Sequence, residues 1–166
     1  MKKLLLILLF VPFVSFGQTA EEYYEKAQVK SAKRDYYGAI ADLTKAAELG
    51  MVFAYFKRGA AKQDLNDNEG ALKDYTIFIN KGGKYVWAFR SRAGIYYDKG
   101  MFQEALEDYL TSISVDPAEE FVNHPYYSIG HCRAALGDMD GACKDWKKSS
   151  SLGNKVASED ILKYCN

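Results

Sequence analysis

The feature that most constrains this fold is a short residue pattern that occurs four times. Each copy contains an alanine, and these alanines are spaced by 32, 34 and 37 residues: Ala39, Ala71, Ala105 and Ala142. A small residue lies twelve positions before each alanine: Ala27, Gly59, Ala93 and Gly130. An aromatic lies four positions before each small residue: Tyr23, Tyr55, Phe89 and Tyr126. A large apolar residue lies four positions after each alanine: Leu43, Tyr75, Tyr109 and Trp146. A sequence period of this length is typical of stacked repeats.

The spacing within each copy predicts two amphipathic helices joined by a turn. Apolar residues recur at intervals of three and four, as on one face of a helix. Turn-prone residues separate the halves, for example Asn66-Asp67-Asn68 and Gly137-Asp138. Small residues on both sides of the turn would let two antiparallel helices approach closely. Such a hairpin cannot bury its apolar face alone, so the hairpins are expected to stack.

This pattern resembles the tetratricopeptide repeat family, which pairs a small residue with an alanine twelve positions later and ends in proline. The third copy matches best, with Phe89, Ala93, Tyr96, Gly100, Phe102, Ala105, Tyr109 and Pro117. Lys30, Lys62 and Arg133 depart from the pattern, because the family prefers an aromatic there. The endings of two other copies, with Trp146, also resemble Sel1-type repeats. The resemblance covers residues 20–165 and implies an all-α, right-handed α-solenoid.

The expected organisation is a leader followed by one repeat domain. Lys2 and Lys3 precede an apolar run of about 11 residues, and the run is too short to span a bilayer. We therefore expect a signal peptide over 1–17 and an exported bacterial protein, periplasmic or extracellular; the alternative is an uncleaved anchor. The predicted repeat domain, 18–166, comprises units at about 20–51, 52–84, 86–117 and 123–154, and a capping helix at 155–165. Val156, Ile161 and Leu162 are expected on the buried side of this cap, and Glu159, Asp160 and Lys163 on its outer side.

The three cysteines favour a disulfide in an exported chain. Cys143 with Cys165 is the preferred pair, because a capping helix packs on the helix before it. Cys132 would then be free. Pairing of Cys132 with Cys143, or three reduced cysteines, remain the alternatives.

Charge and motifs narrow the classes of function. Without the leader the chain has 20 basic and 22 acidic residues, which argues against nucleic acid as a partner. No phosphate loop, dinucleotide fingerprint or nucleophile elbow occurs. His124, His131, Cys132 and Cys143 do not fit a zinc spacing. We therefore expect no enzyme activity, no cofactor and no metal.

The family resemblance implies that the first helices of the hairpins line a concave groove. Counting along the pattern places these residues in that groove or at its rim: Tyr24, Gln28, Phe56, Gln63, Trp87, Arg90, Tyr97, Tyr127 and His131. The Lys and Asn set with which some family members clamp a terminal carboxylate is absent. The matching positions hold Tyr24, Gln28, Phe56 and Ala60.

An aromatic groove favours a protein-interaction module that binds a peptide or a segment of a partner protein. Two alternatives stay open. The same rings would stack on sugars in a glycan-binding protein, and the end of the stack would support self-association.

Overall fold

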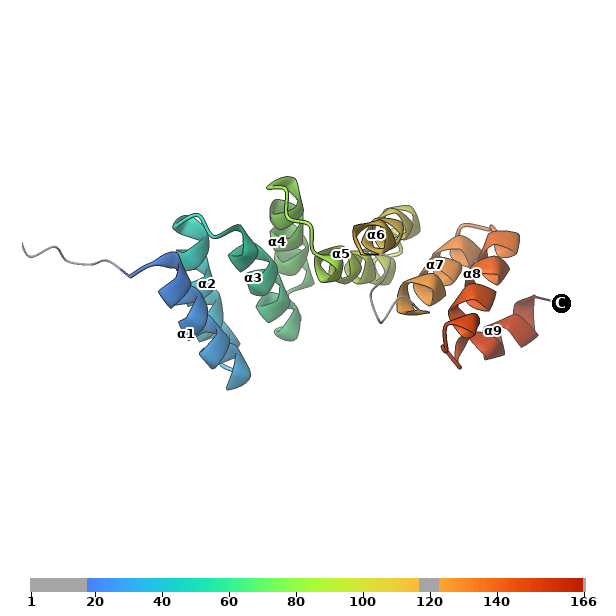
Figure 1. The fold of residues 1–166 in the computed structure, drawn as a ribbon, viewed down its shortest axis with the longest axis horizontal. Helices are drawn as coiled ribbons and strands as arrows, with labels where there is room; N and C mark the ends of the chain where they lie inside the picture. Colours follow the sequence, from blue (N-terminus) through green and yellow to red (C-terminus); the bar gives the residue numbers. More distant parts are fainter. Residues whose placement is uncertain (1–17, 117–122, 166) are drawn as a thin grey trace, which may run out of the picture.

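The computed structural model describes residues 18–116 and 123–165, and the helices of these residues form a single extended array (Figure 1). The predicted signal peptide lies outside the described residues. Nine helices occur in the described ranges, and no strand occurs there. They are α1 (Ala20–Ala32), α2 (Tyr36–Glu48), α3 (Val52–Asp64), α4 (Asn68–Asn80), α5 (Val86–Asp98), α6 (Phe102–Val115), α7 (Asn123–Ala135), α8 (Met139–Ser151) and α9 (Ala157–Tyr164). None of these helices is long and apolar enough to cross a membrane.

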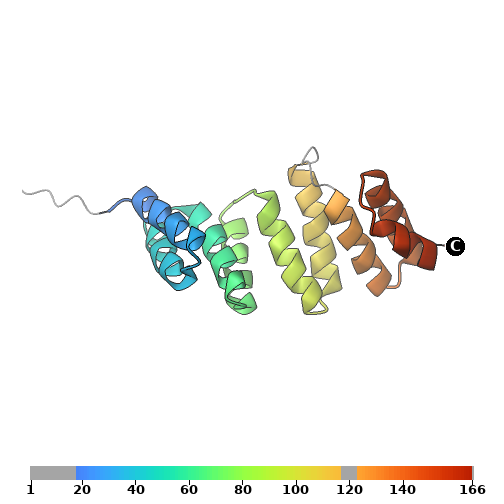
Figure 2. The ribbon, with the colours of Figure 1, turned by 90° about the horizontal axis from the view of Figure 1, so that it is seen from below.

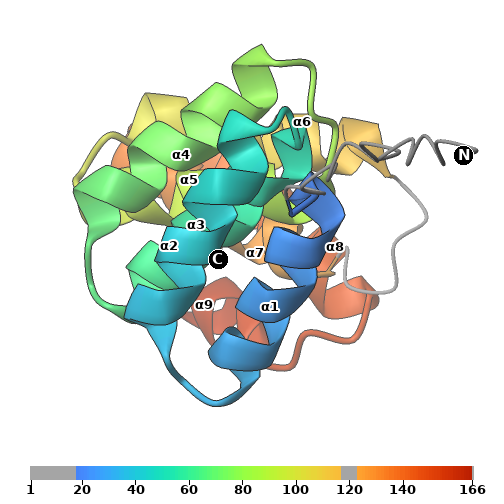
Figure 3. The ribbon, with the colours of Figure 1, turned by 90° about the vertical axis from the view of Figure 1, so that its left-hand side faces the viewer.

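The first eight helices pair as antiparallel hairpins, and each hairpin stacks on the one before it. Figure 2 shows the hairpins following one another along the long axis, with α9 at the C-terminal end. In the end-on view of Figure 3, successive hairpins are rotated about that axis, so the array is a superhelix. The predicted all-α solenoid is confirmed.

The turn inside each hairpin has a recurring local structure. One residue adopts a positive φ: Arg34, Asn66, Gly100 and Gly137. In three hairpins an aspartate follows and caps the second helix, accepting a hydrogen bond from a glycine amide three positions later. An aspartate at this position accepts a hydrogen bond from an amide that has no partner within the helix, and its negative charge interacts favourably with the positive end of the helix dipole. The sequence therefore both ends the first helix and starts the second within three residues.

The repeated small residues lie where the paired helices approach most closely. All eight are buried, as predicted. A Cβ on Gly59 would lie 2.8 Å from the Tyr75 ring, and a Cβ on Gly130 would lie 2.4 Å from Trp146 Nε1. The absent side chain therefore makes room for the large residue four positions after the alanine.

An aspartate lies three residues after each repeated alanine and is ion-paired in every hairpin: Asp42, Asp74, Asp108 and Asp145. Asp42 is partly buried, and the other three are buried. Asp74 shows the arrangement in full. Arg58 donates to both of its carboxylate oxygens at 2.6 and 2.9 Å, and Lys62 Nζ lies 2.8 Å away. Arg58 also donates to Thr44 Oγ1 of the preceding hairpin at 3.0 Å. One guanidinium thus joins two neighbouring units and fixes their relative rotation.

The third hairpin repeats this bridge with different residues. Arg92 donates to both oxygens of Asp108 at 2.7 Å and to Thr76 of the preceding hairpin at 3.2 Å. The remaining aspartates are paired within their own hairpins, Asp42 with Lys30 at 2.6 Å and Asp145 with Arg133 at 2.5 Å. The lysines and arginine that depart from the family pattern are therefore the partners of these acids. Burial raises the pKa of Asp145, and Arg133 opposes that increase.

The C-terminal helix α9 packs on α8 and is tied to it by a disulfide between Cys143 and Cys165. The predicted faces of this helix are partly wrong. Leu162 is 74% exposed and Val156 is exposed as well, whereas Ala157 is fully buried.

Candidate functional site: an aromatic groove

The first helices of the hairpins share one face of the array, and three surface hollows lie along it. Lys57 on α3 and Ser128 on α7 occupy the same position of the repeat, two residues before the small glycine. Each lines a hollow between its own helix and the first helix of the preceding hairpin. Their equivalence places the hollows on the same face of the superhelix.

The hollow between α1 and α3 is lined by both polar and apolar side chains. Its volume is about 230 Å³. Its lining residues are Ala27, Gln28, Ser31, Leu43, Lys57, Ala60, Ala61 and Asp64. The Lys57 ammonium lies 5.7 Å from the ring centres of both Phe53 and Phe56. This cation, supported by two rings, is a groove residue that the sequence prediction missed.

Two adjoining hollows between α5 and α7 are lined mainly by aromatic rings. They have volumes of about 200 and 260 Å³ and share Tyr109 and Ser128. The first also contains Tyr97, Tyr127 and His131, and the second contains Trp87, Arg90 and Pro125. A hydrogen bond joins Tyr109 to Ser128 across the junction of the hairpins.

The tyrosines of this region keep their protons at neutral pH. Burial raises the pKa values of Tyr97 and Tyr109. Burial, with a hydrogen bond to Asp160, raises the pKa of Tyr127 to about 12. The hollows therefore offer neutral hydroxyl groups and ring faces, which suit hydrogen bonding and apolar contact.

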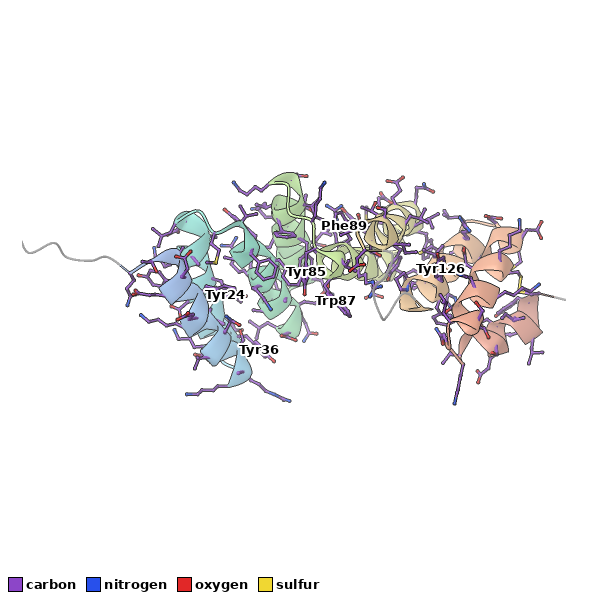
Figure 4. The ribbon with its side chains drawn as sticks, viewed as in Figure 1. Tyr24, Tyr36, Tyr85, Trp87, Phe89 and Tyr126 are labelled. Atoms are coloured by element: carbon purple, nitrogen blue, oxygen red, sulfur yellow. A yellow bond between two sulfur atoms is a disulfide. The ribbon has the colours of Figure 1, made fainter. Side chains whose placement is uncertain are left out.

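Most of the predicted groove residues lie at this face. Gln28 borders the hollow between α1 and α3, and Tyr24 stands beside Phe53 with ring centres 6.2 Å apart. Trp87 is 42% exposed, and the Arg90 guanidinium lies 5.2 Å from its ring centre. Figure 4 shows Tyr24, Tyr85, Trp87 and Tyr126 following one another along the long axis.

The prediction that Phe56 faces the groove is wrong. Its side chain is only 7% exposed and belongs to a core cluster with Tyr75 and Phe78. The ring of Tyr85, which precedes α5, covers it edge-on at 4.9 Å. Tyr85 is itself 37% exposed, so its ring and not that of Phe56 is presented to solvent here.

Hydrogen bonds of Tyr75 link α4 to α3 through Gln63 and to α5 through Ser91. The Tyr75 hydroxyl donates to Gln63 Oε1 at 3.0 Å and is also hydrogen-bonded to Ser91. Gln63 is thus a predicted groove residue whose amide oxygen is engaged by the core. The hollows described above thus lie on either side of a junction that these hydrogen bonds hold together.

The helix α9 closes the C-terminal end of the groove. Asp160 lies 3.3 Å from His131 Nε2 and accepts a hydrogen bond from the Tyr127 hydroxyl. The Tyr127 and His131 rings meet edge-on at 4.5 Å. The prediction that Asp160 lies on the outer side of the cap is therefore wrong. Its position was missed because it depends on contacts with α7, not on the helix periodicity.

The remaining thiol, that of Cys132, belongs to the core. Cys132 is fully buried, and burial raises its pKa to about 11, so its thiol stays protonated. Within 18–116 and 123–165, no group of three or more His, Cys, Asp or Glu residues is placed to hold a metal ion. The side chain of His124 lies outside the description.

Comparison with known proteins supports the class of fold. Residues 91–119 match the family model described as Tetratricopeptide repeat. No curated protein sequence matches the chain. Among solved structures, a crystal structure of MamA superposes with a TM-score of 0.72 and 25% identity, covering 84% of this chain and 81% of that one.

Two further structures agree with this result. A tetratricopeptide repeat protein from Parabacteroides merdae has a TM-score of 0.72 and 24% identity, covering 84% of this chain and 55% of its own. The N-terminal domain of stress-induced protein-1 from C. elegans has a TM-score of 0.62 and 16% identity, covering 69% of this chain and 94% of its own.

The structure and its neighbours define a helical repeat solenoid, a class of protein–protein interaction module. The particular fold is that of the tetratricopeptide repeat proteins, and residues 91–119 carry a repeat that matches that family. The Sel1-like features of the last unit remain a sequence-based expectation.

Proposed function

We propose that this chain is a non-enzymatic binding module of the bacterial cell envelope that holds an extended segment of a partner protein in the aromatic groove. The groove is defined here by Tyr24, Gln28, Lys57, Tyr85, Trp87, Arg90, Tyr97, Tyr109, Tyr127, Ser128 and His131. The observation that carries the proposal is the row of hollows on one face of the array, one between α1 and α3 and two aromatic ones between α5 and α7.

The chemistry of the groove suits a peptide. Partly exposed rings such as Trp87 and Tyr85 lose unfavourable contact with water when a ligand covers them. Neutral tyrosine hydroxyls and Gln28 supply hydrogen bonds to a peptide backbone. Because an extended chain advances about 3.3 Å per residue, a segment of several residues would contact more than one hollow.

Location in the envelope rests on the leader-like sequence at 1–17, with its basic start and short apolar run. The envelope location predicts that the chain is cleaved after Gly17 and that removal of residues 1–17 changes its location in the cell. A protein found in the cytoplasm with its leader intact would contradict it.

Site-specific photocrosslinking in native cells tests the groove. A photoreactive residue at Tyr97 should give discrete adducts with a partner chain, because Tyr97 lines the α5–α7 hollow. The matched control is Tyr37 on α2, which is 77% exposed and lines none of the three hollows. Trp87→Ala should weaken the adducts at position 97 and leave helicity unchanged.

Two outcomes would contradict the proposal. Equal adducts from positions 97 and 37 would remove the groove as the binding surface. Loss of the adducts on addition of free saccharides, with no effect of a peptide taken from the crosslinked partner, would favour the glycan-binding alternative.

A further inference from the structure

The disulfide between Cys143 and Cys165 lies in a surface hollow of about 330 Å³. Met139, Asp140, Lys144, Lys147 and Tyr164 complete its lining. Both cysteines are partly exposed, in contrast to the fully buried Cys132. Exposed disulfides are the ones that thiols reach and exchange with, whereas enclosed disulfides resist reduction. Access alone therefore makes this bond a candidate for exchange.

The charges around the hollow give the exchange a direction. Lys147 stands one helical turn after Cys143 on α8, and both residues line the hollow. A neighbouring ammonium stabilises a thiolate and makes it a better leaving group. Cys165 follows the last turn of α9 and carries no neighbouring cation on its own helix closer than Lys163. Attack at Cys165 with departure of Cys143 is the favoured course.

The disulfide is also connected to the groove. It holds the end of α9, the helix that places Asp160 against His131 and Tyr127. The other contacts of α9 are packing of Ala157, Ile161 and the Tyr164 ring against the Trp146 cluster and a hydrogen bond of 3.0 Å between Ser158 and Ser150. Without the covalent tie, a helix of eight residues is too short to be stable by itself.

We propose that Cys143–Cys165 is a thiol–disulfide exchange site whose reduction releases α9 and frees Tyr127 and His131 for a partner. A dithiol is the reductant. Its first thiolate attacks Cys165 Sγ, the Cys143–Cys165 bond breaks, and the electron pair leaves on Cys143 Sγ. Its second thiolate then attacks its own sulfur in the mixed disulfide and releases the Cys165 thiolate. The dithiol becomes a disulfide, and two electrons and two protons are transferred to the two cysteines.

The first test measures the exchange itself on the purified protein with dithiothreitol, quenched with a thiol-blocking reagent and followed by mass spectrometry. Lys147→Gln should slow reduction about threefold, because the departing Cys143 thiolate loses its neighbouring cation. Lys148→Gln is the matched control, since Lys148 is exposed on the same helix but does not line the hollow. With the monothiol glutathione, the mixed disulfide should form on Cys165. A bond that resists millimolar dithiothreitol in the folded protein would overturn the proposal, and so would adducts confined to Cys143.

The second test measures release of α9 by hydrogen exchange. Amides of residues 157–164 should exchange at least tenfold faster in the reduced protein and in the Cys143→Ser, Cys165→Ser double variant, while α1–α6 are unchanged. Unchanged protection of α9 in both would overturn the proposal. The consequence for a partner rests on the proposed function, but neither measurement requires a ligand. If the groove proves not to be a binding surface, the results of these two tests would therefore still hold. If the disulfide proves not to exchange, the crosslinking result at position 97 would still hold.

Discussion

Gly130 gives the sharpest test of how these hairpins are packed. The change is Gly130→Ala, which adds one methyl group at the closest approach of α7 to α8. That methyl carbon would lie 2.4 Å from Trp146 Nε1 and 2.5 Å from Trp146 Cδ1. Trp146 is fully buried, and its ring meets those of His131 at 5.2 Å and Tyr164 at 5.9 Å, so it has little room to move.

The expected magnitude combines two opposing effects. Overpacking a core typically costs about 1–3 kcal/mol, and a contact this short favours the upper end. Alanine also gains about 1 kcal/mol over glycine in a helix interior. We therefore expect Gly130→Ala to lower the free energy of unfolding by about 2 kcal/mol, which corresponds to about 4–8 °C in Tm for a chain of this size.

Gly94 provides the matched control, because it lies in the interior of α5. A Cβ there meets nothing nearer than the Tyr109 hydroxyl at 3.9 Å. Gly94→Ala should therefore raise the free energy of unfolding by about 1 kcal/mol through helix propensity alone. Urea unfolding followed by circular dichroism should separate the two variants by about 3 kcal/mol. Equal stability of the two variants would refute the close-approach argument.

Three further predictions concern other features of the array. Arg34 has a φ of 61° and Asn66 a φ of 62°, a conformation that glycine adopts without strain. Arg34→Gly should therefore raise the free energy of unfolding by about 0.5–1 kcal/mol, and Asn66→Gly should raise it by less, because asparagine tolerates this conformation. Equal gains of the two variants in thermal melts would contradict this prediction. Asp108→Asn breaks a buried ion pair and should cost about 3 kcal/mol, a loss that 1 M salt does not remove in urea unfolding. Burial raises the pKa of Tyr75 from 10.0 to about 12, so the native state binds its proton more tightly and stability should fall by about 2–3 kcal/mol as pH rises from about 10 to about 12. Unfolding measured across that range should lose this component in Tyr75→Phe and keep it in Tyr37→Phe.

The hairpins and their stacking were predictable because they depend on local periodicity and residue size. A small residue, an alanine twelve positions later and a large residue four beyond it specify both the helices and their contact. The ion pairs could also have been predicted from a comparison of the four copies, since an aspartate follows each repeated alanine by three positions. They were missed because Lys30, Lys62 and Arg133 were interpreted only as departures from the family pattern, and the aspartates were not compared between the copies.

The groove was predictable only in part, because neighbouring units determine which side chains reach it. Phe56 occupies a groove position of the repeat, yet Tyr85 covers it from the segment that connects α4 to α5. The path of such a segment depends on tertiary contacts that a repeat pattern does not contain. Lys57 was missed for a related reason: its partners are rings of its own helix, one of them the displaced Phe56.

The depth of the α5–α7 hollow depends on the small core residue that faces Tyr109, and this dependence leads to the last prediction. Where the facing small residue is glycine, the large residue beyond the alanine is fully buried, as Tyr75 and Trp146 are. In the third hairpin the facing residue is Ala93, and Tyr109 remains only partly buried and lines both hollows. In the first hairpin the facing residue is also alanine, Ala27, but the smaller Leu43 is fully buried there. We infer that the Ala93 methyl group leaves too little room for an aromatic ring and keeps the Tyr109 ring at the surface of the groove.

Ala93→Gly should therefore let Tyr109 sink toward α5 and change the binding surface without altering any exposed residue. Helix propensity predicts a cost of about 1 kcal/mol, partly offset by burial of the ring. Nitration by tetranitromethane, mapped by mass spectrometry, should fall at Tyr109 relative to the exposed reference Tyr37. Unchanged nitration at Tyr109 would show that its position is set by the hydrogen bond to Ser128 and not by Ala93. A fall in nitration together with weaker crosslinking at Tyr97 would mean that a buried methyl group controls how the groove meets its partner.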